Sequence, residues 1–288
     1  MTITVGIDSV CYNHTMHARK MNWVGFLDKP AALGAGVVQM DPLWKSQELD
    51  LSIESLSRLN GNLEERGLRI VVKGNSGGMG ALSNPPESSH EDILFFRSKI
   101  EAATKLGAPM VRIVTRAYPY LTEQHALPQG TSREKVLEWV IANLKTLVSV
   151  AEDCGVRIAV ENHGDLRIAE LERILAEVNS TWLGIQFEVL EQVAIFEDPR
   201  LAAERLLRYA ITVHWADAHP LLSDRGFSIT ACPPGVGLID LDGIAKILVK
   251  LPQDLFVFTA FQAKSEDVED DLIQVYLQDL MSRISTTQ

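Results

Sequence analysis

Short apolar, β-branched runs alternate with longer stretches of helical period along the whole sequence, and this alternation constrains the fold more than any other feature. Between the runs, apolar residues recur at helical spacing, as they do from Val136 to Ala151. Strands that alternate with helices form right-handed βαβ units and therefore a parallel sheet. The predicted strands are Ile3–Asp8, Gly36–Met40, Leu68–Val72, Met110–Thr115, Arg157–Glu161, Leu183–Phe187, Ala210–His214 and Leu255–Thr259.

Eight strand–helix units in 288 residues favour a closed (β/α)8 barrel. A doubly wound open sheet is the alternative. However, no G-x-G-x-x-G motif follows the first strand and no P-loop is present. No linker rich in Pro, Gly or Ser divides the chain. We therefore predict an α/β protein with one TIM-barrel domain over residues 1–288, whose long loops Gly74–Ser89 and Asp217–Gly237 lie where function usually resides.

Charge and composition narrow the class of partner. The chain has 27 basic and 38 acidic residues and a net charge of −11, so a nucleic-acid partner is not expected. The start resembles no signal peptide, and no apolar run approaches the roughly 18 residues of a membrane span. Three widely spaced cysteines match no metal-finger pattern. We expect a cytoplasmic protein that acts on a small molecule, away from membranes.

Three consecutive strands end in residues that can bind a metal. The carboxyl ends of barrel strands converge, so Glu161, Glu188 and His214 are expected to meet at one point. Two carboxylates and an imidazole suit one divalent cation such as Mn²⁺, Co²⁺, Zn²⁺ or Mg²⁺. The alternative is that each residue only marks the start of a solvated loop.

Other polar residues near these strand ends are candidates for substrate binding. Side chains alternate along a strand, so His163 shares a face with Glu161, and Gln186 shares one with Glu188. Asp217 can orient the imidazole of His214 or cap the segment that follows it. Arg112 and Arg116 share a face of the fourth strand, and at least one is expected to pair with a neighbouring carboxylate. Further candidates are Lys73 and Arg225.

The segments VENHGD at 160–165, VHWAD at 213–217 and PGVGLID at 234–240 resemble the xylose isomerase-like TIM-barrel superfamily, the sugar phosphate isomerase/epimerase group. The resemblance covers nearly the whole chain. It implies metal ligands at the ends of strands five to eight, in the order Glu, Asp, His and Glu. Glu161 and His214 match, and Glu188 replaces the Asp. In an ungapped alignment Thr259 stands in place of the last Glu, while a one-residue slip would place Phe258 or Ala260 there.

The resemblance also implies a reaction. Family epimerases use the fifth- and eighth-strand carboxylates as an acid/base pair on either side of an enediolate. Here Glu161 would serve as ligand and base, with no carboxylate at Thr259 to return the proton. Glu191, which stands at a family substrate-binding position three residues after the sixth-strand ligand, or His163 could replace the missing base. An acidic Glu191 would suit a neutral, hydroxyl-rich substrate better than a phosphorylated one.

The expected function is therefore a metal-dependent sugar (phosphate) isomerase or epimerase of carbohydrate metabolism, acting on a small polyhydroxylated or keto substrate. One alternative is a lyase or dehydratase that uses Glu161 alone. Another is a metal-free barrel that serves as a binding or scaffold protein. The endonuclease branch of the superfamily ranks last, because the chain is acidic. Family members frequently form dimers or tetramers, so the resemblance allows a homo-oligomer.

Overall fold

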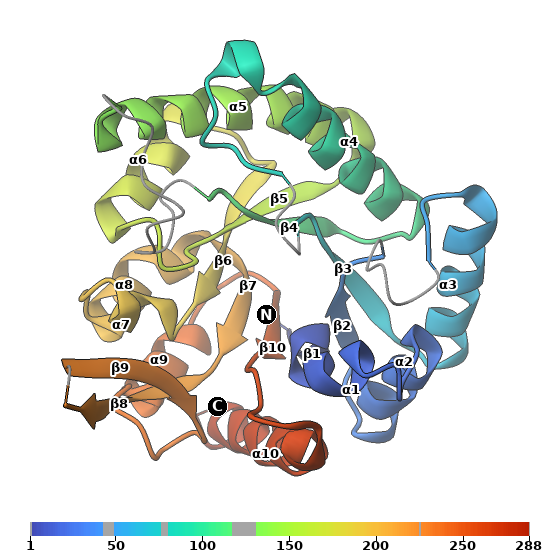
Figure 1. Ribbon diagram of the computed structural model, residues 1–288, viewed down its shortest axis with the longest axis vertical. Helices are drawn as coiled ribbons and strands as arrows, with labels where there is room; N and C mark the ends of the chain where they lie inside the picture. The colour runs from blue at the N-terminus through green and yellow to red at the C-terminus, as the bar shows by residue number, and fades with distance from the viewer. Residues whose placement is uncertain (1, 43–48, 76–79, 117–130, 225, 288) are drawn as a thin grey trace.

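A computed structural model shows a closed barrel of eight parallel strands, the predicted TIM barrel (Figure 1). The structure describes residues 2–42, 49–75, 80–116, 131–224 and 226–287. β1 pairs with both β2 and β10, which closes the barrel. All eight predicted strands are confirmed, with ends that differ by at most one residue. They are β1 (Ile3–Asp8), β2 (Val37–Met40), β3 (Arg69–Lys73), β4 (Met110–Val114), β5 (Arg157–Glu161), β6 (Leu183–Glu188), β7 (Ala210–Trp215) and β10 (Leu255–Thr259).

Helices surround the strands on the outside of the barrel (Figure 1). The ends of these helices are set by capping residues, as α5 illustrates. It begins after Ser132, whose side chain accepts a hydrogen bond from the Lys135 N–H, and it ends at Gly155, which has a φ of 66°. The described helices are α1 (Asn13–His17), α2 (Trp23–Ala32), α3 (Ile53–Glu65), α4 (His90–Lys105), α5 (Arg133–Cys154), α6 (Ile168–Val178), α7 (Glu191–Ala194), α8 (Pro199–Leu206), α9 (Leu241–Leu248) and α10 (Glu269–Thr287). Short 3₁₀ turns occupy Ser9–Tyr12, Pro86–Ser88, Leu207–Tyr209 and Glu266–Val268.

The segment Asp217–Gly237, expected to be a loop, contains a hairpin. β8 (Asp217–Ser223) pairs antiparallel with β9 (Gly226–Cys232) in a separate two-stranded sheet. The sequence does not indicate these strands, because apolar and polar residues alternate only weakly there and outer positions such as Leu222 and Phe227 remain exposed. Among the described residues, no helix combines the length and apolar character needed to cross a membrane.

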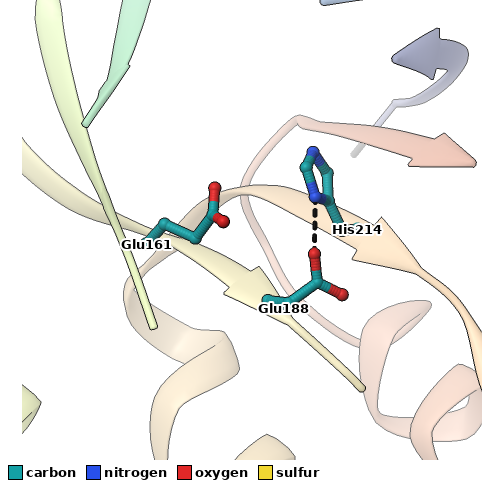
Figure 2. Close-up of side chains that lie close together, drawn as sticks. All are labelled: Glu161, Glu188 and His214. Carbon is teal, nitrogen blue, oxygen red and sulfur yellow. Dashed lines mark hydrogen bonds and ion pairs between the residues drawn. The ribbon is translucent and has the colours of Figure 1, made fainter. Parts of the chain in front are cut away.

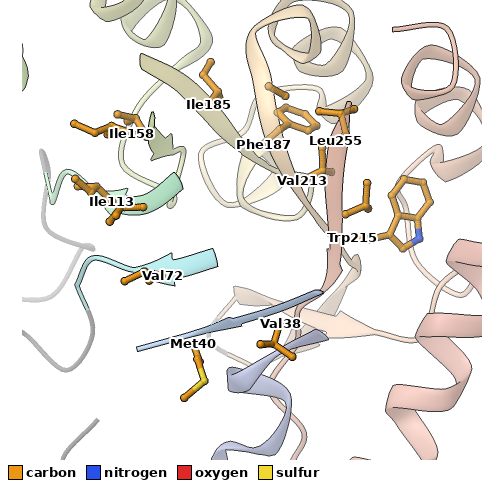
Figure 3. Close-up of a cluster of buried hydrophobic side chains, with 14 of the residues drawn as sticks. Val38, Met40, Val72, Ile113, Ile158, Ile185, Phe187, Val213, Trp215 and Leu255 are labelled. Carbon is orange, nitrogen blue, oxygen red and sulfur yellow. The ribbon is translucent and has the colours of Figure 1, made fainter. Parts of the chain in front are cut away.

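Two apolar clusters divide the core. Strand residues that point outward pack against the helices, and Figure 3 shows part of this outer cluster, including Val38, Val72, Val213 and Trp215. Residues that alternate with them point into the barrel. This inner cluster consists of Val37, Val71, Met110, Ala159, Ile211, Phe256 and Phe258. The inner cluster forms the floor beneath the polar strand ends.

Candidate metal centre

The three predicted ligands meet at the carboxyl ends of neighbouring strands. Glu161 ends β5, Glu188 ends β6 and His214 lies on β7, where it is directly opposite Glu188 in the strand register. One ligand atom from each residue lies within 4.8 Å of the others. All three side chains are buried. Figure 2 shows them together at the strand ends, with the contact between Glu188 and His214 dashed. The chain therefore brings two carboxylates and one imidazole together out of bulk water.

A polar layer surrounds this cluster because the inward-pointing positions change character near the strand ends. Two residues after the apolar inward positions Val37, Val71, Met110 and Ala159, each strand presents a polar side chain. These side chains are joined by hydrogen bonds or ion pairs to one another or to β1. The layer consists of Asp8, Gln39, Lys73, Arg112, Glu161, Gln186, Glu188 and His214.

The carboxylate of Glu161 is strongly held in its ionised form. Arg112 Nη2 donates to Oε1 at 2.9 Å and Arg112 Nε donates to Oε2, a bidentate pair that confirms the predicted arginine–carboxylate contact. Gln186 Nε2 also donates to Oε2, and His163 Nδ1 lies 3.2 Å from Oε1. Burial alone would raise the pKa of Glu161, but Arg112 and His163 outweigh it and lower that pKa to about 2.

The imidazole of His214 lies between two oxygen atoms. Nδ1 is 2.6 Å from Glu188 Oε2, and Nε2 is 2.6 Å from Gln39 Oε1. Asn162 fixes the backbone beside Glu188, because its amide accepts from the Glu188 N–H at 2.8 Å and donates to the Glu188 carbonyl at 3.0 Å. Burial raises the pKa of Glu188. Asn162 and Gln39, which lie outside the cluster of Glu161, Glu188 and His214, therefore help to position Glu188 and His214.

The residues present fit a divalent cation. Oε1 of Glu188 is buried and has no hydrogen-bond partner among the described residues, so one carboxylate oxygen beside His214 is still to be satisfied. The donor set of two carboxylates and one imidazole is the kind that binds Zn²⁺ or Mn²⁺. Asp8 adds a third buried carboxylate 3.5 Å from His214 Nε2. The buried cations Lys73 and Arg112 lie in the same layer and oppose the binding of a further cation.

The other sequence-predicted residues occupy distinct places. His163 lies between Glu161 and Glu191, 3.3 Å from Glu191 Oε1. Burial opposes protonation of His163, but Glu161 and Glu191 outweigh it and raise its pKa. Lys73 Nζ pairs with Asp8 Oδ1 at 2.7 Å, deep in the barrel mouth. Gln186 joins Glu161 to Gln39.

Asp217 contributes differently from the three strand-end residues. The Asp217 carboxylate accepts from the backbone N–H groups of Gly235, Gly237 and Ile239 at 2.9–3.2 Å. These contacts correspond to the capping alternative, because they fix the turn before α9. The imidazole of His214 is oriented by Gln39 and Glu188 instead. Arg225 lies outside the described residues.

The strand register corrects the expected position on the eighth barrel strand. Thr259 pairs with Ile7 on one side and with Trp215 on the other, and both belong to the outer cluster. Paired residues of a parallel sheet face the same way, so Thr259 points toward the helices and away from His214. The inward residue opposite His214 is Phe258, whose ring centroid lies 6.2 Å from the imidazole centroid. Thr259 is therefore not placed to bind a cation together with His214.

Sequence reasoning did not single out Asp8 and Gln39. Each is a polar residue at the end of an otherwise apolar strand, and both are fully buried. The same alternation that pairs Gln186 with Glu188 was available for them.

Comparison with known proteins places the chain in a family. A family model described as "Xylose isomerase-like TIM barrel" matches residues 27–278. The chain therefore belongs to the xylose isomerase-like TIM barrel family, as the sequence motifs indicated. A curated relative, the uncharacterized protein YihM of Escherichia coli K12, is 24% identical over 180 residues, which are 62% of this chain. The match spans only about half, 52%, of that relative's length.

Solved structures share the fold over nearly the whole chain. The IolI protein, crystallised with a bound zinc atom, superposes with a TM-score of 0.77 at 19% identity and 99% coverage of both chains. The structure of L-ribulose 3-epimerase gives a TM-score of 0.74 at 14% identity, covering 100% of this chain and 96% of that one. At these identities the likeness establishes the fold, and the chemistry must be argued from the site itself.

Proposed function

We propose that this protein is a metal-dependent isomerase or epimerase of small polyhydroxylated or keto substrates. The observation that carries the proposal is the buried cluster of Glu161, Glu188 and His214 at the carboxyl ends of three adjacent strands. The zinc bound to the IolI protein and the activity named for L-ribulose 3-epimerase support it by analogy of fold. A bound cation would polarise a substrate carbonyl and stabilise negative charge that develops on its oxygen.

The chain's own groups have separable roles in this proposal. Glu161, Glu188 and His214 hold the cation, and Glu161 is the candidate base beside it. Its low pKa makes Glu161 a weak base while Arg112 remains bound to both oxygens, so Arg112 controls how available that carboxylate is. His163 is the second candidate for moving a proton, because it bridges Glu161 and Glu191 and its side chain is 34% exposed.

The charges around the mouth favour a neutral substrate. Lys73 and Arg112 are the cations of the polar layer, and each already pairs with a carboxylate. Glu191 adds negative charge beside His163. A phosphate group would meet these carboxylates with no cation of that layer released to bind it. We therefore place hydroxyl-rich neutral sugars and keto compounds ahead of sugar phosphates.

The first experiment counts metal. The protein is purified without a His tag, and its content of Mn, Co, Zn, Fe and Mg per chain is measured by elemental analysis, alongside Glu161→Gln and the surface control Glu177→Gln. We expect about one equivalent in the wild type and in Glu177→Gln, with loss in Glu161→Gln. A site that stays empty after metal is supplied would overturn the metal-dependent proposal.

Turnover is tested on the metal-loaded protein. A panel of ketoses is incubated in D₂O, and deuterium incorporation beside the carbonyl is followed by NMR. Enolisation chemistry predicts exchange in the wild type and in Glu177→Gln and none in Glu161→Gln. Equal exchange in Glu161→Gln would exclude Glu161 as base.

A second candidate function is a metal-free binding or scaffold protein. Its supporting observation is Arg112, which already supplies Glu161 with a bidentate positive partner. This function predicts that neither Mn²⁺ nor a chelator shifts the melting temperature, whereas a bound cation would raise it in proportion to the logarithm of free metal.

A further inference from the structure

We propose that the hairpin of β8 and β9 binds a second copy of this chain through an apolar patch, so that the protein forms a two-fold symmetric dimer. Figure 1 shows the hairpin at the periphery of the barrel, beside α7. The surface lies outside the candidate metal centre, and the proposal does not depend on metal binding.

The strand register gives the hairpin one face that is entirely apolar. Leu222 pairs directly with Phe227, and paired residues of antiparallel strands point to the same side of the sheet. Side chains alternate along each strand, so every second residue from this pair toward the barrel shares that side. The members of this hairpin face are Ala218, Pro220, Leu222, Phe227, Ile229 and Ala231. The opposite face also carries polar residues, among them Asp217, His219 and Thr230.

The hairpin face is covered near the barrel and open toward its tip. Ala218 belongs to the outer apolar cluster, and Ile229 packs against that cluster. Leu222, in contrast, is 89% exposed and Phe227 is 54% exposed. Phe196, in the connection between α7 and α8, contacts Phe227 edge-on with ring centroids 6.1 Å apart, and it is itself 77% exposed. The two rings therefore meet at the surface, where neither is protected from water.

A turn beside β8 adds further apolar surface. The Leu238 N–H donates to the Ala218 carbonyl at 2.8 Å, which places residues 236–238 along β8. Val236 is 66% exposed and Leu238 is 69% exposed. The apolar patch is defined by the exposed side chains of Phe196, Leu222, Phe227, Val236 and Leu238.

The size of the apolar patch fits contact with a second copy. At these exposed fractions its five side chains leave on the order of 500 Å² per chain open to water. The largest apolar patch of a typical soluble monomer is about 300–600 Å² and is often functional. Two copies packed together would bury on the order of 1,000 Å², which is the lower limit for a specific interface. A second copy is therefore sufficient to cover the patch.

Charge favours a second copy over a charged partner. None of the five patch residues is charged, although the chain carries a net charge of −11. A basic partner would be recognised by carboxylates, and these five side chains offer none. A two-fold axis brings the same apolar side chains of both copies together, so an uncharged apolar patch is complementary to itself. The acidic remainder of each copy repels the other, so salt should strengthen the contact by screening that repulsion.

The hairpin has little support of its own. Among the described residues, β8 and β9 pair only with each other, and an isolated two-stranded sheet is marginally stable in water. A second copy packed on the hairpin face would supply the second layer that such a sheet needs. Dimerisation should therefore also protect the hairpin backbone from exchange with solvent.

The first test is the mass of the protein in solution as a function of concentration. Analytical ultracentrifugation of the whole chain should show a monomer–dimer equilibrium with a Kd in the micromolar range, as expected of a small interface. The dimer should become tighter as NaCl is raised from about 0.05 M to about 0.5 M. A wild type that stays monomeric up to about 1 mM overturns the proposal. A dimer that salt dissociates also overturns it, because ion pairs would then hold the two copies together.

Two variants locate the contact on the hairpin. Leu222→Asp and Phe227→Asp should each weaken the Kd at least about 100-fold, because each places an unpaired carboxylate in the buried interface of both copies. Ile53→Asp is the matched control. Ile53 is 74% exposed at the start of α3, on the other side of the barrel (Figure 1), and this variant should dimerise like the wild type. An unchanged Kd in Leu222→Asp, or an equal loss in Ile53→Asp, overturns the proposal.

Hydrogen exchange locates the contact without any variant. In the wild type, backbone amides of β8 and β9 should exchange at least about tenfold more slowly above the Kd than below it. Protection confined to another part of the chain would show that a different face forms the dimer, and would overturn the proposal. None of these measurements involves metal, so failure of the dimer and failure of the proposed function are distinguishable.

Discussion

The barrel mouth has two unequal parts, polar from β1 to β7 and apolar at β10, which are called the polar half and the apolar half. In the polar half the inward residues at the strand ends are charged or polar, including Arg112, Glu161 and His214. At β10 the corresponding inward residue is Phe258, directly opposite His214 in the strand register. At this register an aromatic ring, and not a carboxylate, therefore lies beside His214.

The apolar half is adapted to that ring. A Cβ atom built on Gly6 of β1 would lie 2.7 Å from Phe258 Cε1 and 2.4 Å from the carbonyl oxygen of Val37, so only glycine fits. The polar half, in contrast, balances its carboxylates with Arg112 and Lys73. The comparison teaches that one barrel mouth can hold ion pairs at some strand ends and apolar packing at another, because each strand end is supported by different neighbours.

The largest expected effect concerns the charge balance of the polar half. Arg112→Met leaves the buried Glu161 carboxylate without its bidentate partner, which should cost about 3–5 kcal/mol of the free energy of unfolding. If a cation binds at Glu161, it should replace part of the lost charge. The rise in melting temperature on adding Mn²⁺ should then be larger in Arg112→Met than in the wild type.

Arg112→Lys is the control for this prediction. It keeps a positive charge but loses the fork that binds both oxygens, so its stability should lie between those of the other two proteins. Equal Mn²⁺ shifts in all three proteins would show that Arg112 and the metal do not act on the same carboxylate. The polar half would then be an internal ion-pair network.

Acid unfolding tests the same half through the pKa of Glu161. This pKa is lowered from 4.5 to about 2 in the folded protein, so the ionised form stabilises the fold above about pH 4.5. That stabilisation, on the order of 3 kcal/mol, should be lost as the pH falls from about 4.5 to about 2. Urea unfolding with chelator present should show this slope in the wild type and a shallower one in Glu161→Gln. Parallel curves would contradict the assignment.

The apolar half has its own test. Gly6→Ala should lower the free energy of unfolding by about 1–3 kcal/mol, because the added methyl meets the Val37 backbone and the Phe258 ring. Gly61→Ala is the control, since Gly61 lies in α3 with open space around its Cβ position, and it should stabilise the protein by up to about 1 kcal/mol. A neutral Gly6→Ala would show that the packing against Phe258 is loose.

The sequence predicted the barrel and the meeting of Glu161, Glu188 and His214 because both depend on local signals. Alternation along each strand and polar residues at its end are visible in one segment at a time. The partners of distant residues were less predictable. The sequence indicated that Arg112 or Arg116 pairs with a carboxylate, but the choice of Arg112 with Glu161 and the link from Gln39 to His214 depend on which residues the closed sheet brings together. The phase of β10 required the register with β7, which placed Phe258 and not Thr259 opposite His214.

The smallest expected effect tests the direction in which the Thr259 side chain points. Thr259 is fully buried on the outer face of β10, and its hydroxyl has no hydrogen-bond partner among the described residues. Thr259→Val should therefore raise the free energy of unfolding by up to about 1 kcal/mol, because an unsatisfied polar group is removed. The Kd for Mn²⁺ should not change. A loss of metal affinity in Thr259→Val would place the hydroxyl in the site and contradict the orientation that the strand register gives Thr259.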